Sequence, residues 1–153
     1  EIRVIHLTRD VRSWVHSRAR KVRHHGVWAS ELRPLMRWWR LCARDAHRFK
    51  ALGNKVFVLG YEELALQPEV SLRRICNWLE LPFVNTMLEP GAHSTSHVLS
   101  GNRMRFDPAR RKCISYDSDW MQAEPGLTHF ALGFPGLSRL NRRLVYSGFQ
   151  DKK

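Results

Sequence analysis

The chain has 153 residues, of which 43% are hydrophobic, 26% are charged and six are tryptophan. This composition is that of a globular domain and excludes intrinsically disordered and fibrous proteins. No stretch approaches the roughly 18 consecutive apolar residues of a membrane-spanning helix, so no membrane segment is expected. The formal net charge is +12, from 26 Lys and Arg against 14 Asp and Glu.

The positive charge is unevenly distributed. It is +9 over residues 1–50, −2 over residues 51–100 and +5 over residues 101–153. A middle segment of opposite sign argues against a uniformly basic coat for nucleic acid and predicts two separate basic surfaces that converge on one anionic ligand. Solvated helix faces are the alternative explanation.

The cysteines, Cys42, Cys76 and Cys113, are odd in number, widely spaced and without a CxxC pair. We therefore expect free, buried thiols and neither disulfides nor a redox centre. His93 and His97 have the spacing of metal ligands on a helix, but Pro and Gly before them disfavour a helix and no third ligand matches, so no metal site is expected.

The chain begins on a short run rich in β-branched residues, which predicts a strand over residues 2–8. Asp10 is placed to cap a following helix that reaches residue 24, with Val11 and Val15 on its apolar face and His16 on its basic face. Because residue 1 is not Met and the strand follows at once, we expect the chain to be part of a domain whose N-terminal strands are missing.

Helical periodicity continues over residues 30–53, where the helix runs through the apolar residues Leu35, Trp38, Trp39, Leu41, Cys42 and Phe49. A second strand is predicted over residues 55–59. Further elements follow: a helix over 68–80, a long loop over 85–107, a short helix capped by Asp117-Ser-Asp119, and short helices over 127–132 and 137–146. Two strands joined by a mostly helical crossover predict a parallel sheet, hence an α/β fold.

Ligands of parallel sheets bind beyond the carboxyl ends of the strands. Arg9 follows the first strand and Tyr61 follows the second, so both are expected to border the same crevice. Arg9 beside a helix N-terminus, with Ser17 further along that helix, suits a phosphate; the alternative is a structural arginine paired with Asp10. Tyr61 suits stacking on a planar base, and the alternative is a core tyrosine.

The long loop contains a third candidate, His97-Val-Leu-Ser-Gly-Asn-Arg-Met-Arg105. Gly101 permits close approach of the backbone to a ligand, and Arg103 and Arg105 offer guanidinium groups to phosphate. A solvated Gly-Asn turn is the alternative.

Taken in order, these segments resemble the C-terminal half of a PAPS-dependent sulfotransferase, over about residues 2–120. The segment Val4-Ile-His-Leu-Thr-Arg9-Asp-Val-Arg-Ser-Trp-Val-His-Ser17 is similar to the family's 3′-phosphate-binding strand and helix, with Val11 where the family usually has Pro. Val58-Leu-Gly-Tyr61-Glu-Glu-Leu resembles the strand that ends beside adenine, and residues 97–105 resemble the loop that closes over the nucleotide.

The resemblance implies a partial three-layer α/β/α parallel sheet of the P-loop NTPase-like sulfotransferase type, with residues 1–153 as the C-terminal portion of one domain. It implies PAPS (3′-phosphoadenosine 5′-phosphosulfate) as co-substrate, no metal and no nucleic acid. The acceptor would be a hydroxyl or amine of a carbohydrate, lipid or small molecule. The residues implied to bind PAPS or its product PAP are Arg9, Ser17, Tyr61, His97, Gly101, Asn102, Arg103 and Arg105.

The family's 5′-phosphosulfate loop and general base would precede residue 1, so no catalytic residue is assigned and no turnover is expected of this chain alone. A function of a different class is a basic interaction module that binds nucleic acid or another polyanion. Its candidate residues are the helix cations Arg12, Arg18, Arg20, Lys21 and Arg23.

Overall fold

The computed structural model describes residues 2–20, 26–89, 114 and 116–149. They form two compact units, one of residues 1–63 and 117–153 and the other of residues 64–116. No helix among the described residues is both long enough and apolar enough to cross a membrane.

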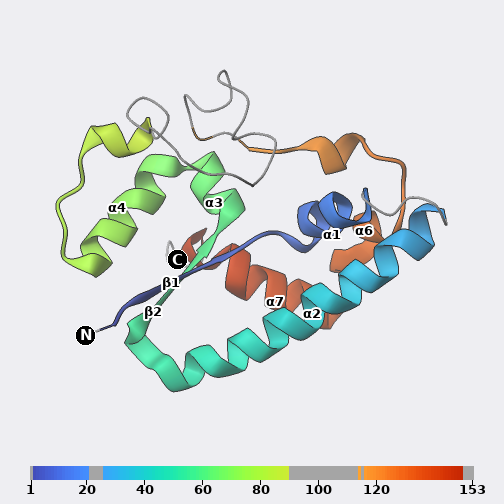
Figure 1. The fold of residues 1–153 in the computed structure, drawn as a ribbon, viewed down its shortest axis with the longest axis horizontal. Coiled ribbons are helices and arrows are strands. Elements are labelled where there is room, and N and C mark those ends of the chain that lie inside the picture. The colour runs from blue at the N-terminus through green and yellow to red at the C-terminus, as the bar shows by residue number, and fades with distance from the viewer. Residues whose placement is uncertain (1, 21–25, 90–113, 115, 150–153) are drawn as a thin grey trace, which may run out of the picture. The chain divides into compact units, whose positions relative to one another are not determined.

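The first unit is built on two parallel strands, β1 (Val4–Thr8) and β2 (Val56–Gly60), as the sequence predicts. Their register pairs Val4 with Val56 and Thr8 with Gly60, so the two strands end side by side (Figure 1). Two helices make the crossover between them, α1 (Val11–Ala19) and α2 (Val27–Leu52), followed by the 3-10 turn η2 (Gly53–Lys55).

The C-terminal part of the chain returns to this unit. It forms η5 (Asp119–Gln122), α6 (Leu127–Phe130), η6 (Ala131–Gly133), α7 (Pro135–Val145) and η7 (Ser147–Phe149). α2 and α7 lie side by side, and α7 also contacts β2 (Figure 1). The core lies where α1, α2, α6 and α7 meet, around Val11, Val15, Trp38, Leu144 and Val145.

Two helical residues have an exposure that their type and spacing alone do not predict. Trp39 is 43% exposed, whereas its neighbour Trp38 is 2% exposed, because consecutive helical residues point about 100° apart. Conversely, His16 is buried although its spacing places it on the basic side of α1. The apolar surface that covers α1 is therefore wider than the helix's own pattern indicates.

The sequence also predicts one helix where the structure has two after β2. α3 (Tyr61–Leu66) begins directly at the strand end, and α4 (Pro68–Leu79) begins with Pro68 in its first turn. In the second unit α4 ends at Glu80, which has a left-handed φ of 61°, and the short η3 (Asn85–Leu88) follows. Within that unit the Cys76 thiol lies 3.7 Å from the Met87 sulfur.

Cys42 and Cys76 are free and buried, which confirms the prediction for these two thiols. Burial, and to a smaller extent the negative charge of Asp45, raise the pKa of the Cys42 thiol to about 12. Cys113 lies outside the described residues.

Candidate functional site

The turn between β1 and α1 is shaped by Asp10. Its side chain accepts a 2.8 Å hydrogen bond from the backbone N–H of Arg12, which satisfies one of the free donors at the start of α1. The predicted helix cap is therefore confirmed. The N–H of Val11, also in the first turn, donates instead to the side-chain oxygen of Asn141 on α7, at 2.9 Å.

The Asp10 carboxylate binds four further donors. Arg12 grips it with Nε and Nη2, both at 2.9 Å, while the amide of Asn141 and the phenol of Tyr146 donate at 2.9 and 2.8 Å. Burial by itself would raise the pKa of Asp10, but the hydrogen bonds from Arg12 and Asn141 and the charge of Arg12 outweigh it and lower the pKa. Asp10 is thus an ionised structural carboxylate, and it neutralises Arg12.

The sequence offers Asp10 as a structural partner of Arg9, but in the structure the Arg9 side chain binds other residues. Its Nη2 forms an ion pair with Asp117 at 2.8 Å, and its Nε donates to the Ser13 hydroxyl at 2.9 Å. Its backbone carbonyl accepts a 3.0 Å hydrogen bond from the buried indole of Trp38. Arg9 is therefore held at both its backbone and its side chain, with 22% of that side chain still exposed.

Arg9 and Tyr61 lie together, as their positions after the two strands predict. Because Thr8 pairs with Gly60, the next residue of each strand falls at the same edge of the sheet. The Arg9 guanidinium carbon lies 5.0 Å from the centre of the Tyr61 ring, within the range of a cation–π contact. Burial raises the pKa of Tyr61, and the nearby charge of Arg9 opposes that rise.

Glu62 ties the end of β2 to the β1–α1 turn. Its carboxylate accepts from the Asp10 N–H at 2.9 Å and from the Ser13 hydroxyl at 2.8 Å, and its side chain is fully buried. Burial raises the pKa of Glu62, hydrogen bonds from Asp10 and Ser13 lower it, and the negative charge of Asp10 adds to the rise. The chain Arg9 to Ser13 to Glu62 fixes the orientation of the guanidinium.

The sequence does not single out Glu62, Asp117, Asn141 or Tyr146 as site residues. Asp117 has a local signal, since it was expected to cap the next helix, and its carboxylate does accept the Asp119 N–H at 3.2 Å. Its second role, as the partner of Arg9, has no local signal.

Ser17 lies on α1 one turn after Ser13 and is half-buried. The other predicted ligand-binding residues, His97, Gly101, Asn102, Arg103 and Arg105, lie outside the described residues.

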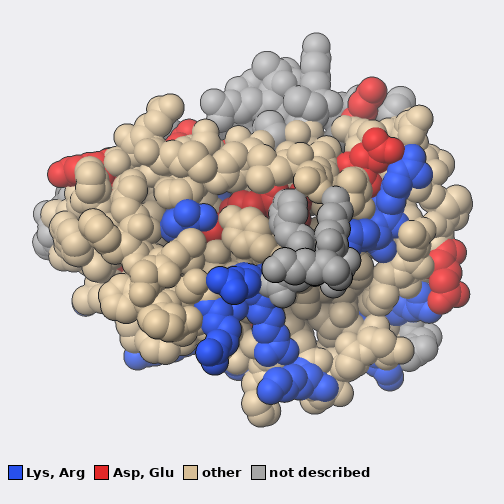
Figure 2. All heavy atoms as spheres, turned by 180° about the vertical axis from the view of Figure 1, so that it is seen from behind, with Lys and Arg blue, Asp and Glu red and all other residues tan. Residues whose placement is uncertain are grey.

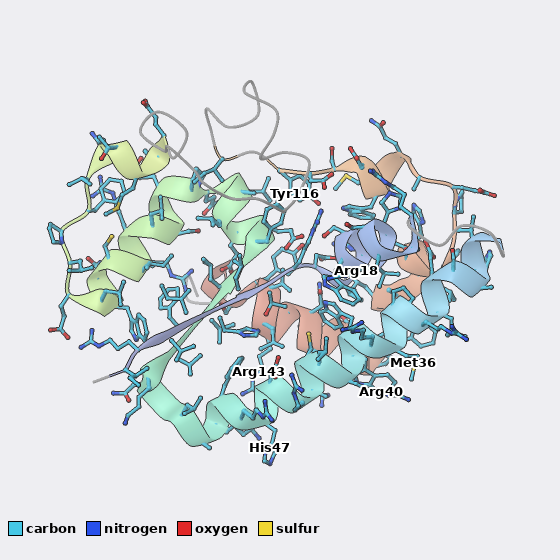
Figure 3. The ribbon with its side chains drawn as sticks, viewed as in Figure 1. Arg18, Met36, Arg40, His47, Tyr116 and Arg143 are labelled. Atoms are coloured by element: carbon cyan, nitrogen blue, oxygen red, sulfur yellow. The ribbon has the colours of Figure 1, made fainter. Side chains whose placement is uncertain are left out.

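Most of the cations of the alternative basic module already contact a carboxylate or an aromatic ring of the protein. Arg12 lies over the Trp120 ring at 4.4 Å in addition to binding Asp10, Arg20 pairs with Asp119 at 3.1 Å, and Arg18 lies 5.3 Å from the Trp14 ring on the exposed side of α1 (Figure 3). Lys21 and Arg23 lie outside the described residues.

Within the part of the chain that the structure describes, no group of three His, Cys, Asp or Glu could hold a metal ion.

Comparison with known proteins gives one result. The model of the sulfotransferase family matches residues 1–85, which is more than half of the chain and includes β1, α1, β2 and Tyr61. The chain therefore belongs to the sulfotransferase family, a class of group-transfer enzymes. Searches of curated proteins and of solved structures found no significant match.

Proposed function

We propose that this chain binds PAPS and its product PAP at the carboxyl end of β1, as part of an enzyme that transfers the sulfuryl group to a hydroxyl or amine. The observation that carries the proposal is the Arg9 guanidinium, which is held at the strand end, against the Tyr61 ring and beside the start of α1.

The 3′-phosphate of the nucleotide is the group that Arg9 suits. Nε and Nη2 of Arg9 are bonded to Ser13 and Asp117, while its Nη1 has no hydrogen-bond partner among the described residues. A guanidinium binds phosphate through two parallel donors, and the Asp117 carboxylate now occupies one of them. We propose that a phosphate oxygen shares the Nη2 donor of Arg9 with Asp117 and that the Ser17 hydroxyl supplies another donor.

Tyr61 suits the adenine of the same ligand. Its ring is half-buried and borders Arg9, so one nucleotide would place its base on the ring and its 3′-phosphate on the guanidinium. The resemblance of residues 97–105 to a nucleotide-covering loop adds His97, Gly101, Asn102, Arg103 and Arg105 to the proposed binding residues.

The proposed reaction is an in-line displacement, in which the bond from sulfur to the 5′-phosphate oxygen breaks as the acceptor oxygen or nitrogen bonds to sulfur. Arg9 and Tyr61 would touch the far end of the nucleotide. Their contribution is therefore to binding and orientation, and the acceptor's proton is taken by a group outside this site.

We also propose that β1 and β2 are part of a larger, three-layer α/β/α sheet of the P-loop NTPase-like type. The support is the exposure of apolar side chains on β1: Ile5 is 44% and Leu7 54% exposed. Strands of parallel sheets are buried on both faces, so such side chains suit burial by further elements.

Calorimetric titration with PAP and with adenosine 5′-monophosphate, which lacks the 3′-phosphate, tests the proposed site. PAP should bind more tightly, and Arg9→Ala should abolish that preference by weakening PAP about tenfold to a hundredfold, as for loss of a hydrogen bond to a charged group. Arg18→Ala is the matched control, because it removes the same charge from the exposed side of α1. Equal affinity for both nucleotides, or equal effects of the two variants, would contradict the proposal.

A further inference from the structure

The outer side of α2 carries a row of arginines that the site does not use. They recur every three or four residues, so they share one face of the helix, and all are exposed. We call this row the arginine stripe; it consists of Arg33, Arg37, Arg40, Arg44 and Arg48. Figure 3 shows Arg40 and His47 on the side of α2 that points away from the strands.

The charge of the arginine stripe is almost uncompensated. Arg44 pairs with Asp45 at 3.2 Å, while the other four have no ion-pair partner among the described residues. The face seen from behind also carries a group of Lys and Arg side chains toward its lower edge, with no Asp or Glu among them (Figure 2). Such a concentration of one sign attracts an extended anionic partner.

Apolar side chains lie directly beside these arginines. A hollow of about 610 Å³ on α2 is lined by Leu32, Met36 and Leu41 together with Arg33, Arg37 and Arg40. Leu32 is 51% exposed, and the hollow is open to solvent along the helix. The surface therefore offers aliphatic groups and guanidinium groups side by side.

Exposed aromatic rings extend this apolar flank. Trp28 lies one turn before Leu32 and is 53% exposed, and it stacks on Phe130 of α6 with 5.9 Å between ring centres. Trp39 lies further along the same flank and is 43% exposed. Burial in a protein core does not explain these side chains in the first unit, since Trp38 and Leu35 already fill the core side of α2.

We propose that this face of α2 docks on the surface of a membrane that contains anionic lipids. The arginine stripe would bind the lipid phosphates and carboxylates, and Leu32, Met36 and the Trp28 indole would enter the interfacial region, where such groups are favoured. A linear polyanion fits less well. It would engage the arginines but gain nothing from aliphatic Leu32 and Met36, and Trp28 already has one ring face covered by Phe130.

This surface is separate from the nucleotide site. Trp38, on the core side of α2, binds the carbonyl of Arg9, whereas the arginine stripe points to the opposite side of the helix. Membrane docking and PAP binding can thus be measured independently, and loss of one does not imply loss of the other.

The test is co-sedimentation of the 153-residue chain with vesicles of phosphatidylserine mixed into phosphatidylcholine, against vesicles of phosphatidylcholine alone. Binding should be confined to the anionic vesicles and should weaken as salt is raised. Arg33→Gln with Arg37→Gln should weaken it about 25-fold, given the contribution of each basic residue near an anionic surface. Arg73→Gln with Arg74→Gln on α4 removes the same charge and should leave binding close to that of the unchanged protein.

Leu32→Asn tests the apolar part and should reduce vesicle binding severalfold with the charge unchanged. Circular dichroism establishes that each variant is folded; if the arginine variant is not, the unchanged protein with the two vesicle types still decides the matter. Equal binding to both vesicle types, or equal losses in the two arginine pairs, would overturn the proposal. Retention on heparin without binding to anionic vesicles would also overturn it. So would a dimer that forms without vesicle binding and that Leu32→Asn abolishes.

Discussion

The Tyr146 phenol donates a 2.8 Å hydrogen bond to the Asp10 carboxylate, joining the end of α7 to the start of α1 across 136 residues of sequence. Asn141 on the same helix binds the same carboxylate. The geometry of the Arg9 turn thus depends on a helix from the far end of the chain.

Removing this phenol should destabilise the protein. Tyr146→Phe keeps the packed ring and leaves Asp10 with one donor fewer, so we expect the free energy of unfolding to fall by about 1.5 to 3 kcal/mol, the range for hydrogen bonds to charged groups. Urea unfolding followed by tryptophan fluorescence measures it. Ser118→Ala, at an exposed position, is the control and should change it by less than about 0.5 kcal/mol. Equal stabilities for the two variants would show that the bond contributes nothing.

Gly60 allows close contact between β2 and α7. A Cβ at this position would overlap the backbone carbonyl of Val145, which cannot move without shifting the end of the helix. We expect Gly60→Ala to cost at least about 3 kcal/mol or to prevent folding. Gly133→Ala is the matched control, because nothing lies within 4 Å of the added methyl group. Thermal unfolding compares the two, and similar melting temperatures would contradict this packing.

Two buried carboxylates predict opposite effects of acid. The raised pKa of Glu62 means that the folded state binds this proton more tightly than the unfolded state does. The free energy of unfolding therefore rises as the pH falls from neutral toward 4.5, the ordinary pKa of this side chain. The lowered pKa of Asp10 means that stability is then lost below its ordinary value of 3.8. In Glu62→Gln the first rise should be missing. Urea unfolding at several pH values measures this, and a stability difference between the two proteins that does not vary with pH would refute it.

In the proposed nucleotide site, Asp117 would compete with the 3′-phosphate for Arg9. Asp117→Asn should therefore raise the affinity for PAP, by roughly two- to fivefold for a partly exposed ion pair. Asp119→Asn is the matched control, since it removes an equal charge from the exposed pair with Arg20. Calorimetry measures both variants. If Asp117→Asn weakened PAP binding, the carboxylate would instead be needed to orient Arg9.

Cys42 should be chemically inert in the folded protein. With its pKa raised to about 12, little thiolate exists at pH 8, and the thiolate is the reactive form. Labelling with iodoacetamide, followed by mass spectrometry of the peptide, should be slow in buffer and fast in urea. Equally fast labelling under both conditions would mean that the side chain is not buried as described.

Local patterns determined the elements and one side of the site. Apolar periodicity predicts β1, β2 and the helices between them, and the position of Arg9 and Tyr61 after parallel strands predicts that they meet. The same patterns are wrong about His16, because spacing along a helix shows which residues share a face but not how much of that face is covered.

The sequence by itself determined the Asp10 cap, because a hydrogen bond across two residues depends only on local geometry. Only the tertiary structure decided which groups hold Arg9 and Asp10 in place. The partners Glu62, Asp117 and Asn141 are 52, 108 and 131 residues away from the atoms that they bind. Contacts over such separations leave no periodic signal, since they form only when packing of the apolar helix faces brings distant polar groups within hydrogen-bonding distance.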